Sequence, residues 1–120
     1  MNKRTLKPIS RKPSRRGGRR WQRQLVHHAC KRLGERYGLY LDTRGYEALC
    51  EAIRQALAGR GGSPLGGRRL YRRDGITTWH LVRVDGRPAV AVWDARFGRI
   101  VSFVPPADLA TAGLKLEDVA

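Results

Sequence analysis

The sequence predicts an α+β fold in which two N-terminal helices pack on a four-stranded antiparallel meander sheet, preceded by a disordered basic tail. Two Asp-Gly pairs, Asp74-Gly75 and Asp85-Gly86, lie between alternating or apolar runs, which is the strongest short-range signal for β-hairpins. Apolar residues at spacings of three and four precede this region and indicate two amphipathic helices. The 120 residues suit one domain with a modest core.

The first helix is predicted from about Arg19 to Tyr37, with an apolar stripe of Trp21, Leu25, Ala29 and Leu33. Asp42 or Thr43 then caps a second helix that runs to about Ala58. Its stripe consists of Tyr46, Leu49, Cys50, Ile53 and Leu57. The glycine-rich segment 59–67 should be a flexible joint between this helix and the sheet.

Four strands are predicted, at roughly 68–73, 76–84, 87–94 and 99–104. Two-residue loops would pair Arg73 with Ile76 and Val84 with Arg87, and a four-residue loop would pair Asp94 with Arg99. One face, which the helices should cover, then carries Leu70, Trp79, Leu81, Val90, Val92, Val101 and Phe103. The other, open face carries Arg69, Tyr71, Arg73, Thr78, His80, Arg87, Ala91, Trp93 and Ser102.

The tail holds much of the charge. Residues 1–20 contain nine Lys or Arg residues and no acid, within a net charge of +15. Because a segment rich in Pro, Ser, Gly and like charges buries little apolar surface, we expect it to be disordered. We therefore divide the chain into a flexible tail (1–20), one α+β domain (21–106) and a C-terminal tail (107–120) with room for a short helix.

This excess of positive charge favours an anionic polymer as partner, nucleic acid first. A membrane surface is less favoured because the tail lacks bulky apolar residues, and no segment approaches a transmembrane length. The two cysteines fit inert thiols in a reducing cytosol, so we expect a cytoplasmic protein. An Arg- and Ser-rich start also permits a mitochondrial presequence, although the tail lacks amphipathic spacing.

The open face mixes cations with aromatic rings, which suits a nucleic-acid strand because guanidinium groups meet phosphates and bases stack on rings. In the predicted register Arg69, His80, Ala91 and Ser102 form one cross-strand row, with Tyr71, Thr78 and Trp93 beside it. The predicted nucleic-acid-binding residues are Arg15, Arg16, Arg19, Arg20, Arg73, Arg87 and Trp93. The alternative is a sheet face half covered by the tail or a partner, with solvated arginines.

Metal and cofactor sites are not indicated. His27, His28 and Cys30 are close in sequence, but a zinc site needs four ligands in recognisable pairs and no second pair exists. Phosphate-cradling and dinucleotide-binding motifs are missing as well. We therefore expect no metal and no small-molecule cofactor.

His80 is the candidate for chemistry, because a histidine on a basic face can move protons at neutral pH. In metal-free RNA cleavage by the 2′-hydroxyl, Arg69 would meet the charge of the phosphorane together with Arg73 or Arg87. Ser102 or Tyr71 would orient a phosphate by a hydrogen bond. The alternative for His80 is a half-buried strand residue whose ring nitrogens are satisfied by neighbours.

The segment YEALCEAIRQALAG, a glycine-rich break and then RRLYRRDGITTWHLVRVDGRPAVAVWDARFGRIVSFVPP resemble small bacterial and phage proteins of the RelE/BrnT-like fold. That superfamily includes barnase-like and colicin-type ribonucleases, and the resemblance covers about residues 43–106. It implies two helices on a curved sheet with RNA on the open face. The family's His on an early strand and Ser or Thr on the last strand match His80 and Ser102, whereas the long basic tail departs from the family.

Two functions stay open at this point: a toxin-type or phage endoribonuclease, or a non-enzymatic protein that binds RNA, a ribosome or RNA polymerase through its tail and sheet. The implied partner is RNA or a ribonucleoprotein, with an antitoxin or RNA polymerase as a possible protein partner. A double-stranded-RNA-binding module is less favoured, because it needs a strong C-terminal helix that residues 105–120 do not clearly provide.

Overall fold

The computed structural model describes the backbone of residues 15–120 and side chains from residue 20 onward. It confirms the α+β fold. The elements are α1 (Arg15–Tyr37), α2 (Thr43–Leu57), β1 (Gly66–Arg72), β2 (Thr77–Val84), β3 (Arg87–Asp94), β4 (Arg99–Phe103), the 3-10 helix η2 (Pro106–Ala112) and α3 (Leu116–Val119). The four strands form one antiparallel sheet in the order β1-β2-β3-β4.

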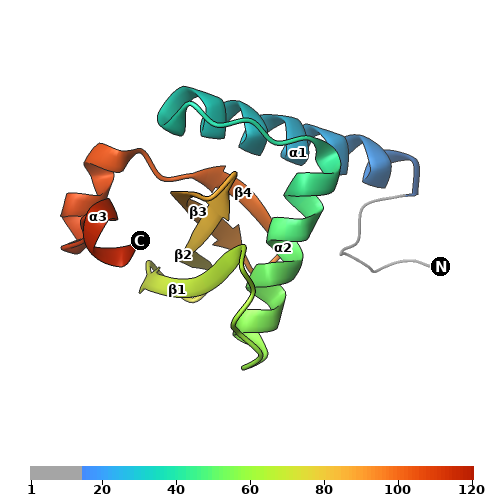
Figure 1. Ribbon diagram of the computed structural model, residues 1–120. Helices are drawn as coiled ribbons and strands as arrows, with labels where there is room; N and C mark the ends of the chain where they lie inside the picture. The colour runs from blue at the N-terminus through green and yellow to red at the C-terminus, as the bar shows by residue number, and fades with distance from the viewer. Residues whose placement is uncertain (1–14) are drawn as a thin grey trace.

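The elements form layers on both faces of the sheet (Figure 1). On one face, α1 packs against β4 and α2 packs against β1. Figure 1 shows η2 and α3 on the side of the sheet away from α2. The C-terminal segment, for which only a short helix was expected, therefore forms a third layer.

The helix starts differ in how well they were predicted. α2 begins where expected, because the Asp42 side chain caps it by accepting a hydrogen bond from the Gly45 amide at 2.7 Å. α1 begins at Arg15, a few residues before the predicted start at about Arg19. Arginine is a good helix former, whereas Gly17 and Gly18 in the same run are poor ones, so helix propensity alone does not explain the early start. The predicted disorder of residues 1–14 lies outside the described residues.

The predicted register is confirmed at two of three turns, where Val84 pairs with Arg87 and Asp94 pairs with Arg99. At the first turn the prediction is wrong. The Arg73 amide donates to the Thr77 carbonyl at 3.0 Å, so three residues form the loop instead of two. The Asp74 carboxylate accepts from the amides of Ile76 and Thr77 at 2.8 and 2.7 Å, which stabilises this longer turn.

The assignment of the two faces was also wrong. The helices cover the face that carries His80, where the core contains Val82, Val84, Ala89, Ala91, Trp93, Ile100 and Phe103. The opposite face carries Leu70, Trp79, Val90 and Val92, which pack against Leu109, Leu114 and Leu116 of the C-terminal segment. Alternation alone could not choose between the faces, because both are apolar and both are covered.

Tyr46 joins α2 to the last strand. Its ring is fully buried, and its hydroxyl donates to the Ile100 carbonyl at 2.6 Å. Burial raises the pKa of this phenol, so the hydroxyl keeps its proton. Replacing Tyr46 with Phe should lower the free energy of unfolding by about 1–2 kcal/mol, because the buried carbonyl loses its donor. Urea titration checks this, and Tyr40→Phe at a 79% exposed ring is the control expected to change nothing.

Candidate nucleic-acid interface

His80 does not lie on an open surface. Its side chain is fully buried, with Nδ1 at 2.8 Å from the Gly67 carbonyl and Nε2 at 2.8 Å from the Thr78 hydroxyl. Because a carbonyl can only accept, Nδ1 carries the hydrogen and Nε2 accepts from Thr78. Burial lowers the pKa of His80 from its ordinary value, and the nearby charge of Arg69 adds to this, so the ring is neutral at pH 7.

The expected exposure of His80 is therefore wrong. The structure instead contains a buried strand histidine whose two ring nitrogens both have hydrogen-bond partners. In this conformation the ring cannot reach an RNA substrate. The alternation places His80 on one face with Val82 and Val84. Trp79 and Leu81 make the other face apolar as well, so the pattern did not indicate that His80 is buried under the helices.

The other predicted catalytic residues are not brought together. Arg69 lies directly opposite His80 in the strand pairing, as predicted, but its side chain is exposed. Ser102 pairs with Val92 instead of Ala91, because an extra residue in β4 shifts the register. Its hydroxyl lies 3.4 Å from an Nη of Arg36, on α1. Tyr71 pairs with Trp79 instead of Thr78, because β1 carries a similar irregularity.

The predicted nucleic-acid-binding residues are scattered. Trp93 is only 4% exposed and lies beneath the Arg54 guanidinium, 5.8 Å from the ring centre, so its predicted position on an open face is wrong. Arg73 and Arg87 are exposed but lie at opposite ends of β2. Arg20 is exposed near the start of α1, whereas the side chains of Arg15, Arg16 and Arg19 lie outside the described part.

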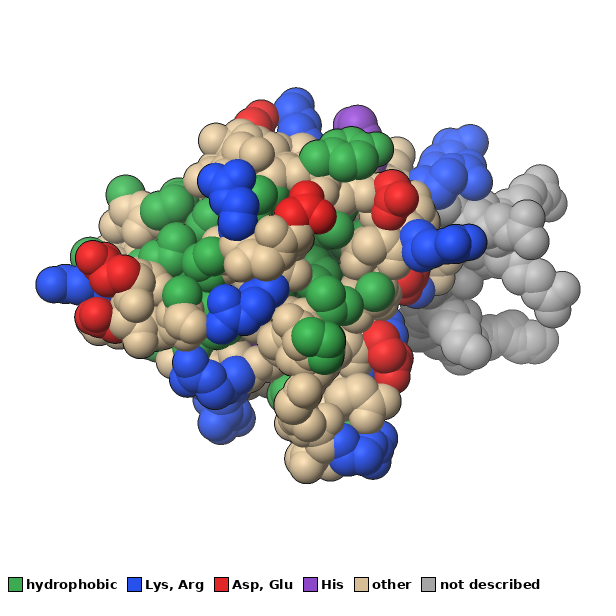
Figure 2. Space-filling model, viewed as in Figure 1, with side chains coloured by type: hydrophobic (Ala, Val, Ile, Leu, Met, Phe, Trp, Pro, Cys, Tyr) green, Lys and Arg blue, Asp and Glu red, His purple; other side chains and the backbone are tan. Residues whose placement is uncertain are grey.

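A basic surface does exist, along the edge strand β1. Four arginines lie on or next to this strand and all are exposed: Arg68, Arg69, Arg72 and Arg73. The ion pairs formed within the described side chains involve Glu35, Glu47, Glu51 and Asp94, and none of them reaches β1. Figure 2 shows Lys and Arg side chains gathered at the lower left, around the position of β1 in Figure 1.

Two aromatic rings accompany these arginines. Tyr71 of β1 and Trp79 of β2 are half-buried, with ring centroids 4.8 Å apart and an angle of 47° between the ring planes. Trp79 belongs to the sheet face opposite α1 and α2. We call Tyr71, Trp79 and the four arginines of β1 the β1 surface. The sequence did not predict the contact between Tyr71 and Trp79, because this contact depends on the irregularity in β1. Such an irregularity cannot be recognised from the pattern of residues.

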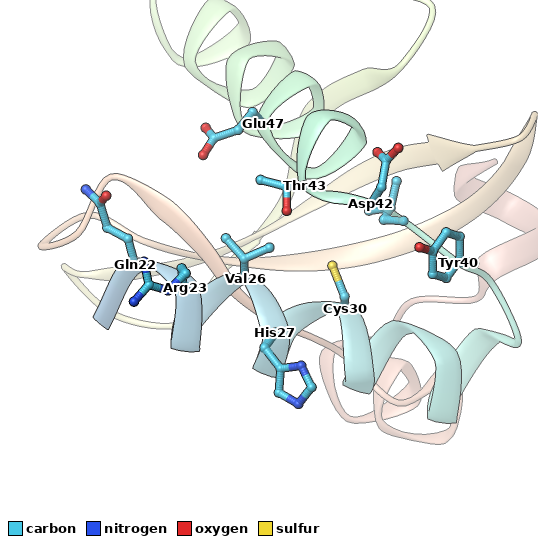
Figure 3. Close-up of a pocket in the computed structure, with 10 residues that line it drawn as sticks. Gln22, Arg23, Val26, His27, Cys30, Tyr40, Asp42, Thr43 and Glu47 are labelled. Carbon is cyan, nitrogen blue, oxygen red and sulfur yellow. The ribbon is translucent and has the colours of Figure 1, made fainter. Parts of the chain in front are cut away.

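A pocket of about 580 Å³ lies between α1 and the start of α2 (Figure 3). Val26 and the Cys30 thiol point into it from α1, whereas the His27 ring points away. Its carboxylates already have partners, because Asp42 caps α2 and Glu47 accepts from Arg99 at 2.6 Å. Burial raises the pKa of the Cys30 thiol, which disfavours the reactive thiolate. These groups do not converge on a reaction centre.

Among the described side chains, no three His, Cys, Asp or Glu residues lie close enough together to hold a metal ion. None of the helices between residues 15 and 120 is long and apolar enough to cross a membrane.

Comparisons add no relative to this description. No family model, no curated protein and no solved structure matches the chain. The resemblance to the RelE/BrnT-like fold therefore stays a prediction.

Proposed function

We propose that this protein binds single-stranded RNA on the β1 surface, with its basic N-terminal residues holding further phosphates, and does so without cleaving the strand. The observation that carries the proposal is the Tyr71–Trp79 ring pair beside the arginines of the edge strand. Stacking on rings and neutralisation of phosphates are the two contributions by which proteins hold an unpaired strand.

The position of β1 supports this function. It is an edge strand with only one neighbour, and its arginine side chains are exposed to solvent. Without carboxylate partners among the described residues, these guanidinium groups lose no ion pair when a phosphate arrives. The RNA of a ribonucleoprotein would present the same phosphates and bases.

The burial of His80 supports binding over cleavage. The endoribonuclease hypothesis needed His80 as a proton-transfer group beside Arg69, and the ring is sealed, neutral and hydrogen-bonded at both nitrogens. The other histidines, His27 and His28, are exposed on α1, on the opposite side of the molecule's sheet from Trp79.

The ring pair can be tested with a conservative change. Tyr71→Leu keeps an apolar side chain but removes the aromatic face, so affinity for a single-stranded RNA of about 12 nucleotides should fall about tenfold. Fluorescence anisotropy of the labelled RNA measures this. Tyr40→Leu removes a ring that is 79% exposed on the connector between α1 and α2, and should leave affinity unchanged. Equal affinities for both variants would contradict the proposal.

The N-terminal residues can be tested by salt dependence. Residues 1–14 contain Lys3, Arg4, Lys7, Arg11 and Lys12. Deleting this segment should weaken binding and make the slope of log K against log salt shallower by about 3, because each phosphate neutralised on a single strand contributes about 0.7. An unchanged slope would remove the segment from the proposal while leaving the β1 surface in place.

A further inference from the structure

A second pocket, of about 510 Å³, lies where the end of α2 and the glycine-rich joint meet β1 and β2. Three arginines line it, Arg68, Arg69 and Arg83, together with Gly61 and Gly62. A Cβ atom on either glycine would meet no atom within 4 Å, so this part of the joint is open. A hollow with three guanidinium groups and no Asp or Glu side chain in its lining is suited to an anion.

The donors of this pocket are partly occupied by the chain itself. Arg68 donates from Nη2 to the main-chain oxygen of Val119 at 3.0 Å, and Arg83 donates from Nη2 to that of Ala120 at 2.7 Å. Val119 is the last residue of the short helix α3 and Ala120 follows it. Leu116, the first residue of α3, packs on the sheet face that carries Trp79. Each guanidinium group has five N–H donors, so most of its hydrogen-bonding capacity is left over.

We propose that this pocket binds a phosphate group of the RNA, and that residues 116–120 occupy two of its arginines until the phosphate displaces them. Two ionic oxygens of one phosphate fit a guanidinium fork better than a single main-chain oxygen does. The segment also carries Glu117 and Asp118, whose charges oppose a phosphate at the same place. Displacement is therefore favoured over joint occupancy.

The pocket lies on the path of a strand bound to the β1 surface. Trp79, Leu81 and Arg83 alternate along β2 and point to the same side of the sheet. Arg83 is four residues from Trp79, which is about 13 Å along an extended strand. An RNA whose base stacks on Trp79 can thus place a phosphate near Arg83. The inference rests on the proposed function in this respect.

The test compares two single-charge variants. Arg83→Gln should weaken binding of the same RNA about tenfold, because it removes a charged hydrogen bond to phosphate. Arg44→Gln removes one positive charge at an exposed position at the start of α2, away from the pocket, and should change affinity less than twofold. If both variants lower the RNA affinity equally, Arg83 contributes only its share of the overall positive charge, and the proposal is wrong.

The source of the phosphate is distinguished by the end group of the RNA. Oligonucleotides with a 5′-phosphate and with a 5′-hydroxyl are measured against wild type and Arg83→Gln. If the pocket takes a terminal phosphate, only the phosphorylated oligonucleotide loses affinity in the variant. If it takes an internal phosphodiester, both lose it equally. If Arg83→Gln lowers the affinity for neither oligonucleotide, the pocket does not bind an RNA phosphate and the proposal is wrong.

Displacement has its own variant. Leu116→Ala weakens the packing of α3 on the sheet, which should free Arg68 and Arg83 and tighten RNA binding about threefold. Unchanged or weaker binding would show that residues 116–120 do not compete with the ligand.

Inorganic pyrophosphate separates this inference from the proposed function. Backbone amide shifts in ¹H–¹⁵N spectra should move around Arg83 when pyrophosphate is added to wild type, and not in Arg83→Gln. If this occurs while no RNA binds, the pocket stands and the proposed function fails. If RNA binding depends on Tyr71 but neither ligand depends on Arg83, the pocket fails and the proposed function stands.

Discussion

Replacing Gly67 with alanine should destabilise the protein by about 3–5 kcal/mol, the largest effect that we expect of a single methyl group in this chain. Gly67 has φ +117°, and a Cβ atom there would lie 2.5 Å from the carbonyl oxygen of Ala52 and 2.9 Å from its carbonyl carbon. Both obstructing atoms belong to the backbone of α2. They can move only if β1 and α2 separate, which would open the core between them.

The control for this prediction is Gly62→Ala. Gly62 has a similar φ of +103°, but a Cβ atom there would meet nothing within 4 Å. Gly62→Ala should lower the free energy of unfolding by only about 1–2 kcal/mol, which is the cost of holding alanine in this backbone conformation. Guanidinium chloride unfolding followed by circular dichroism measures both variants. If the two losses are equal, close packing of β1 against α2 contributes nothing and the prediction is wrong.

Replacing His80 with alanine should lower the free energy of unfolding by about 2–4 kcal/mol at neutral pH. The fully buried ring would leave a cavity next to Trp93, whose ring centroid lies 6.4 Å away. The Gly67 carbonyl would also lose its donor. His28→Ala, at an exposed position on α1, should change stability by less than about 0.5 kcal/mol. Similar losses in both variants would contradict the structural role of His80.

The contribution of His80 should also depend on pH. Its pKa in the folded protein lies below the unfolded value of 6.5, so the unfolded chain binds the proton more readily. The stabilisation is complete above the unfolded pKa and is lost as pH falls through the window between the two values. The difference in unfolding free energy between wild type and His80→Ala should therefore shrink from about pH 7.5 to about pH 5.5. If the difference in unfolding free energy between wild type and His80→Ala grows as the pH falls, the pKa of His80 is not lowered in the folded protein and the prediction is wrong.

Local chemistry was enough to predict much of the fold. Asp85 and Gly86 both adopt positive φ, of 52° and 74°, which is what a two-residue hairpin turn requires and what Asp-Gly supplies. Asp42 caps α2 because its side chain reaches the amide of Gly45, three residues along the chain. These features depend on a few neighbouring residues, so the sequence specifies them directly.

The candidate site was predicted less well, because it depends on which face the helices cover. Arg69 and His80 were paired correctly, yet His80 and Trp93 proved to be buried. Both faces of β2 are apolar, since Val82 and Val84 alternate with Trp79 and Leu81. A periodic pattern fixes which residues share a face, but it does not say which face receives the larger layer.

By itself, the sequence determined the two helices, the four strands, the turn at Asp85-Gly86 and the excess of positive charge. Only the tertiary structure decided that α1 and α2 lie over His80, that Tyr71 meets Trp79, and that the C-terminal segment reaches Arg68 and Arg83. The physical reason is one of range. Turns and caps are made by residues a few positions apart, whereas these contacts join residues from 8 to 51 positions apart, through irregular strands and packed layers.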